Sequence, residues 1–172
     1  MSFTPGGGHE ALRRGRWSTA GADYFLTVCT DNRAPGLTHP EIAPAILSQM
    51  NRLVCRGLWR VRVATIMPEH VHLLATLGED RSLPGALRIF KGGLAPVLRT
   101  MGLRWQRGYF DHRMRRSEDR LPVIMYVYLN PYRARLISAD QKWAWFRCAP
   151  EDWSWFAALT NAACPFPDWL RE

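Results

Sequence analysis

Hydrophobic and polar residues follow strand-like patterns in several short runs of this chain. Residues 24–30, YFLTVCT, are rich in β-branched and aromatic side chains and are bounded by turn-forming residues, a combination that is typical of a strand. Residues 58–67 and 70–77 have the same character, and only Pro68-Glu69 separates them. So short a connection predicts an antiparallel pair. A fourth strand is expected over residues 104–110, RWQRGYF.

Other segments have the spacing of amphipathic helices. Apolar residues recur every three or four positions from residue 42 to about residue 56, where Gly57 favours an end. A second helix is expected to open at Ser82 and to be interrupted at Gly92-Gly93 and Pro96. For a third helix the sequence predicts Ser117 as the cap, a body over residues 122–130, and a break or kink at Pro131.

This order of elements predicts the fold class. Strand, helix, strand, strand, helix, strand is the split βαβ arrangement of ferredoxin-like α+β proteins. It implies a central antiparallel sheet with two helices on one face and the third helix at the other. We expect one domain over residues 1–172, with a basic N-terminal arm (1–20) and a tail rich in Trp and Pro from about residue 143 to 172. The tail is expected to pack over the domain as a brace.

Composition and charge limit the partners. The chain has 172 residues, 47% of them hydrophobic, and a net charge of +8 that comes almost entirely from arginine. Arginine binds phosphate in a bidentate manner and stacks on bases, so a polyanionic partner is favoured. The four cysteines form no C-x-x-C pair, which argues against a disulfide framework or a zinc knuckle. Since no apolar run reaches membrane-spanning length, we expect no membrane partner and a cytoplasmic location.

Four polar residues suggest a catalytic site. His70 and His72 are two apart on a predicted strand and share one face, while Tyr126 and Asn130 are four apart and share one face of the third helix. If that helix crosses the open face of the sheet, the two pairs can meet. Two imidazoles and an amide oxygen suit Mg²⁺ or Mn²⁺. Tyr126 would then be the nucleophile in a phosphoryl transfer.

Four segments of the chain resemble motifs of one protein family. Residues 66–74, IMPEHVHLL, resemble the histidine-hydrophobe-histidine signature of the IS200/IS605-type single-tyrosine (HUH) transposases. Residues 105–113 and 126–134 resemble later motifs of the branch called REP-associated tyrosine transposases, and Trp153-Ser154 is similar to a late motif. The resemblance covers about residues 12–156 and implies the fold predicted above.

The resemblance also implies a reaction and a set of site residues. Cleavage and rejoining of single-stranded, hairpin-containing DNA through a 5′-phosphotyrosine would use Tyr126 as nucleophile and His70, His72 and Asn130 as ligands of Mg²⁺ or Mn²⁺. Candidate DNA-binding residues, from charge and resemblance together, are Arg13, Arg14, Arg16, Lys91, Arg107, Arg113, Arg115 and Arg116. Either a monomer or a homodimer is compatible with the resemblance.

Alternatives remain open at this point. The chain is also compatible with a non-catalytic DNA-hairpin-binding protein derived from such a transposase, or with a metallohydrolase that uses the histidines and a water. Tyr128 and Tyr132 flank Tyr126, but Tyr128 lies about 200° further around a helix and does not share the Asn130 face. His112 follows Asp111, and we expect it to make a structural hydrogen bond.

Overall fold

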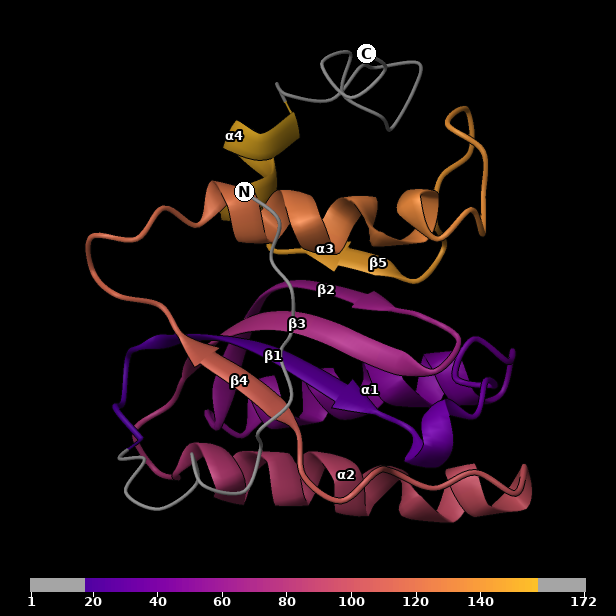
Figure 1. Cartoon of the computed structure of the whole chain (residues 1–172). Helices are drawn as coiled ribbons and strands as arrows, with labels where there is room; N and C mark the ends of the chain where they lie inside the picture. The colour runs from indigo at the N-terminus through magenta and orange to yellow at the C-terminus, as the bar shows by residue number, and fades with distance from the viewer. Residues whose placement is uncertain (1–17, 158–172) are drawn as a thin grey trace.

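A five-stranded antiparallel sheet forms the centre of the protein (Figure 1). The structure is a computed structural model that describes residues 18–157. Its strands lie in the order β4-β1-β3-β2-β5. Their bounds are Asp23–Cys29 (β1), Trp59–Ile66 (β2), His70–Leu77 (β3), Phe110–Arg113 (β4) and Phe146–Cys148 (β5). The predicted α+β architecture with its central antiparallel sheet is therefore confirmed.

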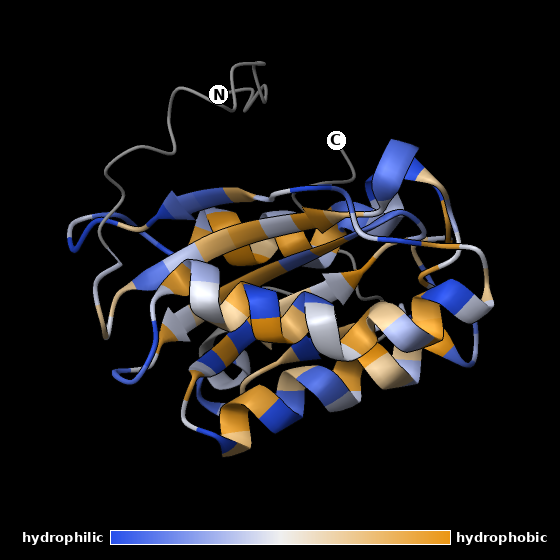
Figure 2. Cartoon of the chain, turned by 90° about the horizontal axis from the view of Figure 1, so that it is seen from below, coloured by the Kyte–Doolittle hydropathy of each residue, from blue (hydrophilic) through white to orange (hydrophobic). Residues whose placement is uncertain are grey.

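Two helices, α1 (Ile42–Cys55) and α2 (Leu83–Thr100), cover one face of the sheet, as predicted (Figures 1 and 2). Their apolar stripes and the sheet residues facing them form the larger of two buried clusters, with Phe90 and Trp59 in contact at its centre. The two helices approach closely where a Cβ on Gly93 would lie 2.3 Å from Nε2 of the buried Gln49 side chain. Glycine at position 93 thus allows Gln49 Nε2 to donate to the Ile89 carbonyl across the helix pair.

The opposite face of the sheet is covered by α3 (Leu121–Arg133), and α4 (Pro150–Phe156) lies beyond α3 (Figure 1). A second buried cluster fills this interface, in which Ile124, Val127 and Leu129 of α3 are fully buried. The Arg120 guanidinium pairs with the buried Asp23 carboxylate of β1, which ties the start of α3 to the sheet. A third helix at the other face is what the sequence predicts.

Several predicted boundaries are wrong. The second helix is not interrupted, because Pro96 lies on the exposed side of α2 and the carbonyl of Gly92, which loses its partner, can bind water there. Ser117 does not cap α3, which begins after Arg120, and Pro131 does not end it. No helix within residues 18–157 has the length and apolar character needed to cross a membrane.

The predicted fourth strand is displaced along the chain. Only Phe110 of the expected segment belongs to β4, and Trp105 makes a single bridge to Thr30 instead of a continuous ladder. The Lys91 ammonium on α2 donates to the carbonyls of Gln106 (2.6 Å) and Gly108 (2.7 Å), so this segment is bonded to α2 as well as to the end of β1, where Gln106 N–H donates to the Cys29 carbonyl at 2.9 Å. β5 and α4 were not predicted from the sequence at all.

Candidate active site

The start of β3 carries the two histidines of the candidate site. His70 and His72 alternate with Val71, which is fully buried against the α1/α2 side, so both imidazoles point to the α3 side. Both histidines are themselves buried, at 7% and 5% exposure. The predicted shared face of the pair is therefore what the structure has.

His72 lies in the middle of a row of side chains that crosses the sheet. Its direct neighbours are Thr27 on β1 and Thr65 on β2, and beyond these stand Phe110 on β4 and Phe146 on β5. Thr27 Oγ1 is 2.9 Å from His72 Nδ1. Thr65 Oγ1 is buried and has no hydrogen-bond partner within the described residues, a state that costs free energy unless a ligand or water satisfies the hydroxyl.

A hydrogen bond to Nδ1 orients each imidazole. The Glu69 carboxylate accepts from His70 Nδ1 at 2.8 Å, and because an ionised carboxylate only accepts, the proton of His70 is on Nδ1. The lone pair of Nε2 is then free to bind a cation. The Nε2 atoms of His70 and His72 face each other 2.9 Å apart. In metal-binding histidines, the ring nitrogen that does not bind the metal regularly donates its N–H to a carboxylate, a carbonyl or water.

Both imidazoles have lowered pKa values. Burial lowers the pKa of His70, although the Glu69 charge and hydrogen bond oppose it. Burial lowers the pKa of His72 well below its ordinary value, and the neighbouring His70 adds to the effect. Both rings are therefore neutral at pH 7, which is the state that binds metal ions.

The spacing of the two nitrogens suits a shared octahedral ion. Two nitrogens that each lie about 2.1 Å from one ion and subtend about 90° at it are about 3.0 Å apart, close to the 2.9 Å between the Nε2 atoms. Residues 18–157 contain no cluster of three His, Cys, Asp or Glu side chains able to hold a metal. Among these residues, a third protein ligand to such an ion would have to be of another residue type, and an amide oxygen is one suitable donor.

Tyr126 on α3 meets the histidine pair. Its hydroxyl oxygen is 3.4 Å from His72 Nε2, and the two ring centroids are 5.1 Å apart. Phe25 of β1 stacks on His72 at 5.5 Å and meets Tyr126 edge-on at 5.8 Å, so one aromatic ring supports both groups. The half-buried Tyr126 side chain is thereby held at the imidazoles while its hydroxyl faces them.

The other polar residues of α3 have different environments. Asn130 follows Tyr126 by one helical turn and is half-buried, and its amide makes no hydrogen bond within residues 18–157. Tyr128 is buried among Phe146 and Trp153, and the Tyr132 hydroxyl donates to the Gln141 carbonyl. Of the three tyrosines on this helix, Tyr126 is the one that the structure places against the histidines.

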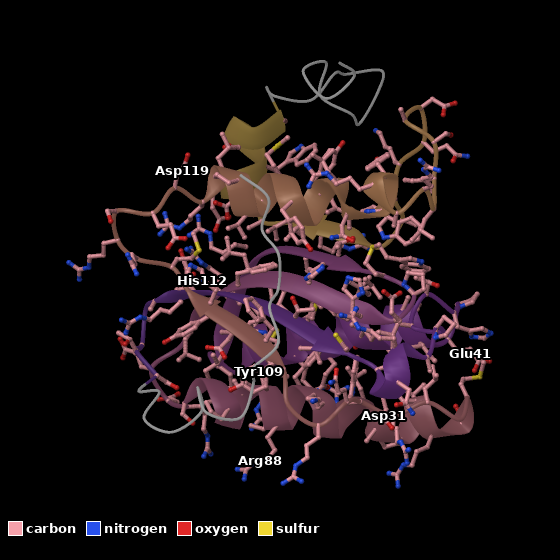
Figure 3. All side chains as sticks on the ribbon, in the orientation of Figure 1. Asp31, Glu41, Arg88, Tyr109, His112 and Asp119 are labelled. Carbon is pink, nitrogen blue, oxygen red and sulfur yellow. The ribbon has the colours of Figure 1, made fainter. Side chains whose placement is uncertain are left out.

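The predicted DNA-binding residues are more scattered. Arg13, Arg14 and Arg16 lie outside the described residues. Arg107, Arg113, Arg115 and Arg116 are exposed, and Arg113 donates to Thr19 Oγ1 at 2.9 Å. Lys91 binds the backbone of residues 106–108, as described above, so its ammonium has a structural partner. His112 on β4 binds Glu118 at 2.8 Å, a structural hydrogen bond of the kind expected for it, and Figure 3 shows it at the strand that leads toward α3.

Sequence reasoning did not include Phe25, Thr27 and Glu69 in the site. Period-two alternation in β1 puts Phe25 and Thr27 on one face, and this signal was available in the sequence. The alternation does not give the β1–β3 register, which places Thr27 opposite His72. Glu69 follows a proline in a two-residue connection, and nothing in that pattern indicates that its carboxylate turns back to His70.

Comparison with solved structures shows that this chain shares its fold with known proteins. The chain is similar to the solved structure of a REP-associated tyrosine transposase bound to a REP hairpin, with a TM-score of 0.64, 20% sequence identity, and coverage of 76% of this chain and 79% of that one. A transposase candidate from Deinococcus radiodurans R1 is matched at a TM-score of 0.48 and 19% identity, covering 72% of this chain and 92% of that one. No protein-family model and no curated protein matches the chain. The sheet and helices of this chain thus have the fold of a REP-associated tyrosine transposase.

Proposed function

We propose that this chain is a metal-dependent single-tyrosine transposase that cleaves and rejoins single-stranded, hairpin-containing DNA through a 5′-phosphotyrosine intermediate. One observation carries the proposal: the Tyr126 hydroxyl lies 3.4 Å from His72 Nε2, and His72 Nε2 lies 2.9 Å from His70 Nε2. A nucleophile beside two neutral, oriented imidazoles is an arrangement that can support metal-assisted phosphoryl transfer. The shared fold and the four sequence motifs support the same assignment.

His70, His72 and Asn130 are the proposed ligands of Mg²⁺ or Mn²⁺, and the bound ion would act as a Lewis acid on a phosphoryl oxygen. The Asn130 amide, which has no hydrogen-bond partner among the described residues, and the Nε2 spacing of the imidazoles support this ligand set. Glu69 and Thr27 keep the rings oriented, and burial keeps them neutral.

Tyr126 is the proposed nucleophile. Its hydroxyl loses a proton and its oxygen bonds to phosphorus, while the bond from phosphorus to the 3′ oxygen of the preceding nucleotide breaks. That oxygen leaves with the electron pair and takes up a proton to become a 3′-hydroxyl. Phe25 and His72 restrict the tyrosine ring, which reduces the entropy lost on reaching the reactive geometry. The phosphotyrosine conserves the bond for rejoining to a second 3′-hydroxyl.

The proposed substrate is a single strand that carries a hairpin. The related structure holds a REP hairpin, and this chain has a net charge of +8. Exposed Arg107, Arg113, Arg115 and Arg116 are the proposed phosphate contacts among the described residues, together with the arm that holds Arg13, Arg14 and Arg16. We propose that residues 1–172 form one DNA-processing domain. The proposed reaction is compatible with a monomer and with a homodimer.

The decisive experiment is a covalent-adduct assay. A pool of single-stranded oligonucleotides, each with one hairpin and randomised flanks, is incubated with the full chain and Mn²⁺, and SDS-resistant adducts are isolated and sequenced. We expect adducts from the natural protein and from Tyr128→Phe, a matched control on the same helix whose ring packs against Phe146 and Trp153 instead of the histidines. Tyr126→Phe should bind the same strands and form no adduct.

Two outcomes would contradict this assignment. If Tyr126→Phe still forms the adduct, Tyr126 is not the nucleophile. If the natural protein binds hairpins tightly and forms no adduct with either Mn²⁺ or Mg²⁺, the non-catalytic hairpin-binding alternative is correct. Phosphodiester cleavage by water that survives the loss of Tyr126 would instead indicate a metallohydrolase.

A further inference from the structure

The loop between β1 and α1 contains an unusual backbone beside the histidines. Asn32 and Arg33 both have left-handed φ values, 51° and 53°, although neither is glycine. Such conformations are costly for residues with a Cβ and persist where surrounding bonds enforce them. Here the Thr30 hydroxyl donates to the carbonyls of Ala34 (2.8 Å) and Glu69 (2.9 Å).

A second set of bonds joins this loop to the β2–β3 connection. The backbone N–H groups of Gly36 and Leu37 both donate to the Pro68 carbonyl at 2.8 Å. Thr30 N–H donates to the Glu69 carbonyl at 2.9 Å. The loop is therefore fixed against residues 68–69, directly before His70 in the chain.

This frame holds the Arg33 side chain close to the site. Arg33 Nη1 is 3.7 Å from Glu69 Oε1, the oxygen that binds His70 Nδ1. At that distance the pair is electrostatic and not a hydrogen bond, and the Arg33 side chain is 61% exposed. Within residues 18–157 the Arg33 guanidinium donates no hydrogen bond, so its N–H groups can bind an external acceptor. After burial, its charge also contributes to the lowered pKa values of His70 and His72.

We propose that Arg33 binds a phosphate that flanks the scissile phosphate on the bound single strand. This inference rests on the proposed function. Glu69 contacts both the Arg33 guanidinium and His70 Nδ1, so Arg33 lies on the Nδ1 side of the His70 ring. The reacting phosphate would bind on the other side of the ring, where the two Nε2 atoms face each other. Arg33 therefore reaches a neighbouring phosphate of the same strand. A planar guanidinium can bind such a phosphate with two parallel hydrogen bonds.

Arg60 is the matched control for this test. It is 55% exposed and lies 3.2 Å from a carboxylate oxygen of Glu151, much as Arg33 lies beside Glu69. Arg60 lies opposite Thr76 in the β2–β3 ladder, near the end of β3 that is farther from His70. Loss of Arg60 removes the same charge from the protein and leaves the histidine end unchanged.

The test measures binding without cleavage, in Tyr126→Phe protein. The probe is a hairpin-bearing single strand with four thymidines on each side, with a methylphosphonate replacing one flank phosphate at a time. We expect Arg33→Ala to weaken binding of the unmodified probe about tenfold and to reduce the slope of log K against log salt by about 0.7, the value for one phosphate contact on a single strand. One methylphosphonate position should abolish the difference between Arg33→Ala and its parent. Arg33→Lys should restore the salt slope and only part of the affinity.

The outcomes separate this proposal from the proposed function. Arg33→Ala that binds like its parent at every probe position, or no more weakly than Arg60→Ala, overturns the role of Arg33, whatever the adduct assay gives. Failure of the adduct assay with a retained, position-specific Arg33 effect overturns catalysis and keeps the phosphate contact. Equal melting temperatures of the variants establish that folding is unchanged.

Discussion

The Nε2 atoms of His70 and His72 face each other at 2.9 Å, and the Nδ1 atom of each ring is already engaged by Glu69 or Thr27. Two neutral imidazoles whose Nε2 atoms converge in this way can both bind one cation. Mn²⁺ or Mg²⁺ should therefore stabilise the natural protein and raise its melting temperature. At a metal concentration of 100 times Kd, the free energy of unfolding should increase by about 2.7 kcal/mol. Differential scanning fluorimetry over a metal titration measures the shift.

The same titration has a matched control. His112 also binds a carboxylate, Glu118, at 2.8 Å, but it lies on β4 away from the pair. His112→Ala should retain the metal-dependent shift, and His70→Ala and His72→Ala should lose it. A full shift in both site variants would place the metal elsewhere.

Phe25 is expected to matter for chemistry through its contacts with both rings. Phe25→Leu keeps an apolar side chain but removes the ring that stacks on His72 and meets Tyr126 edge-on. Cleavage should fall roughly ten- to a hundredfold because the nucleophile is less well positioned, while Mn²⁺ binding remains. Single-turnover cleavage and Mn²⁺ titration of the same samples measure the two effects.

Phe90→Leu is the control for that substitution. Phe90 is fully buried in the other cluster, where it packs on Trp59. We expect a comparable loss of stability and little change in single-turnover rate. If the two variants lower the rate equally, Phe25 acts only through overall stability.

The buried hydroxyl of Thr65 is expected to lower the stability of the metal-free protein. This hydroxyl has no partner within the described residues, so Thr65→Val should stabilise the metal-free protein by about 1 kcal/mol. Thr30→Val, which removes a buried hydroxyl with two carbonyl acceptors, should destabilise it by roughly 1–3 kcal/mol. Urea unfolding without metal compares them. If Thr65→Val destabilises the protein as much as Thr30→Val, the hydroxyl has a partner such as bound water.

Cysteine reactivity should depend steeply on pH. Burial, reinforced by the Asp152 charge, raises the pKa of Cys148 to about 12, which leaves roughly one thiolate in 10⁴ at pH 8. Because the folded pKa lies above the unfolded value, the stability contributed by the neutral thiol is lost as pH rises from about 9 through 12. Iodoacetamide at pH 8 should modify the exposed Cys55 and leave Cys148 unmodified until urea is added. Peptide mapping checks both sites, and rapid labelling of folded Cys148 would refute the shift.

The sequence by itself determined the fold class and the two local pairs of site residues. Alternation of side chains along a strand puts His70 and His72 on one face, and a separation of four on a helix puts Tyr126 and Asn130 on one face. Both are properties of local backbone geometry. The same local reasoning failed at residues 104–110, where the contact with the sheet is one bridge between Trp105 and Thr30 and where Lys91 of α2 binds two backbone carbonyls.

The approach of Tyr126 to His72 depends on the tertiary structure. The β1–β3 register brings Thr27 and Phe25 to the histidine side of the sheet, and the Asp23–Arg120 pair ties α3 over it. The left-handed backbone of Arg33 lies in a loop that the Thr30 hydroxyl bonds to the Glu69 carbonyl, 39 residues away in the chain. The β1–β3 register and the conformation of this loop depend on such long-range contacts, which a local pattern of residues specifies only in part.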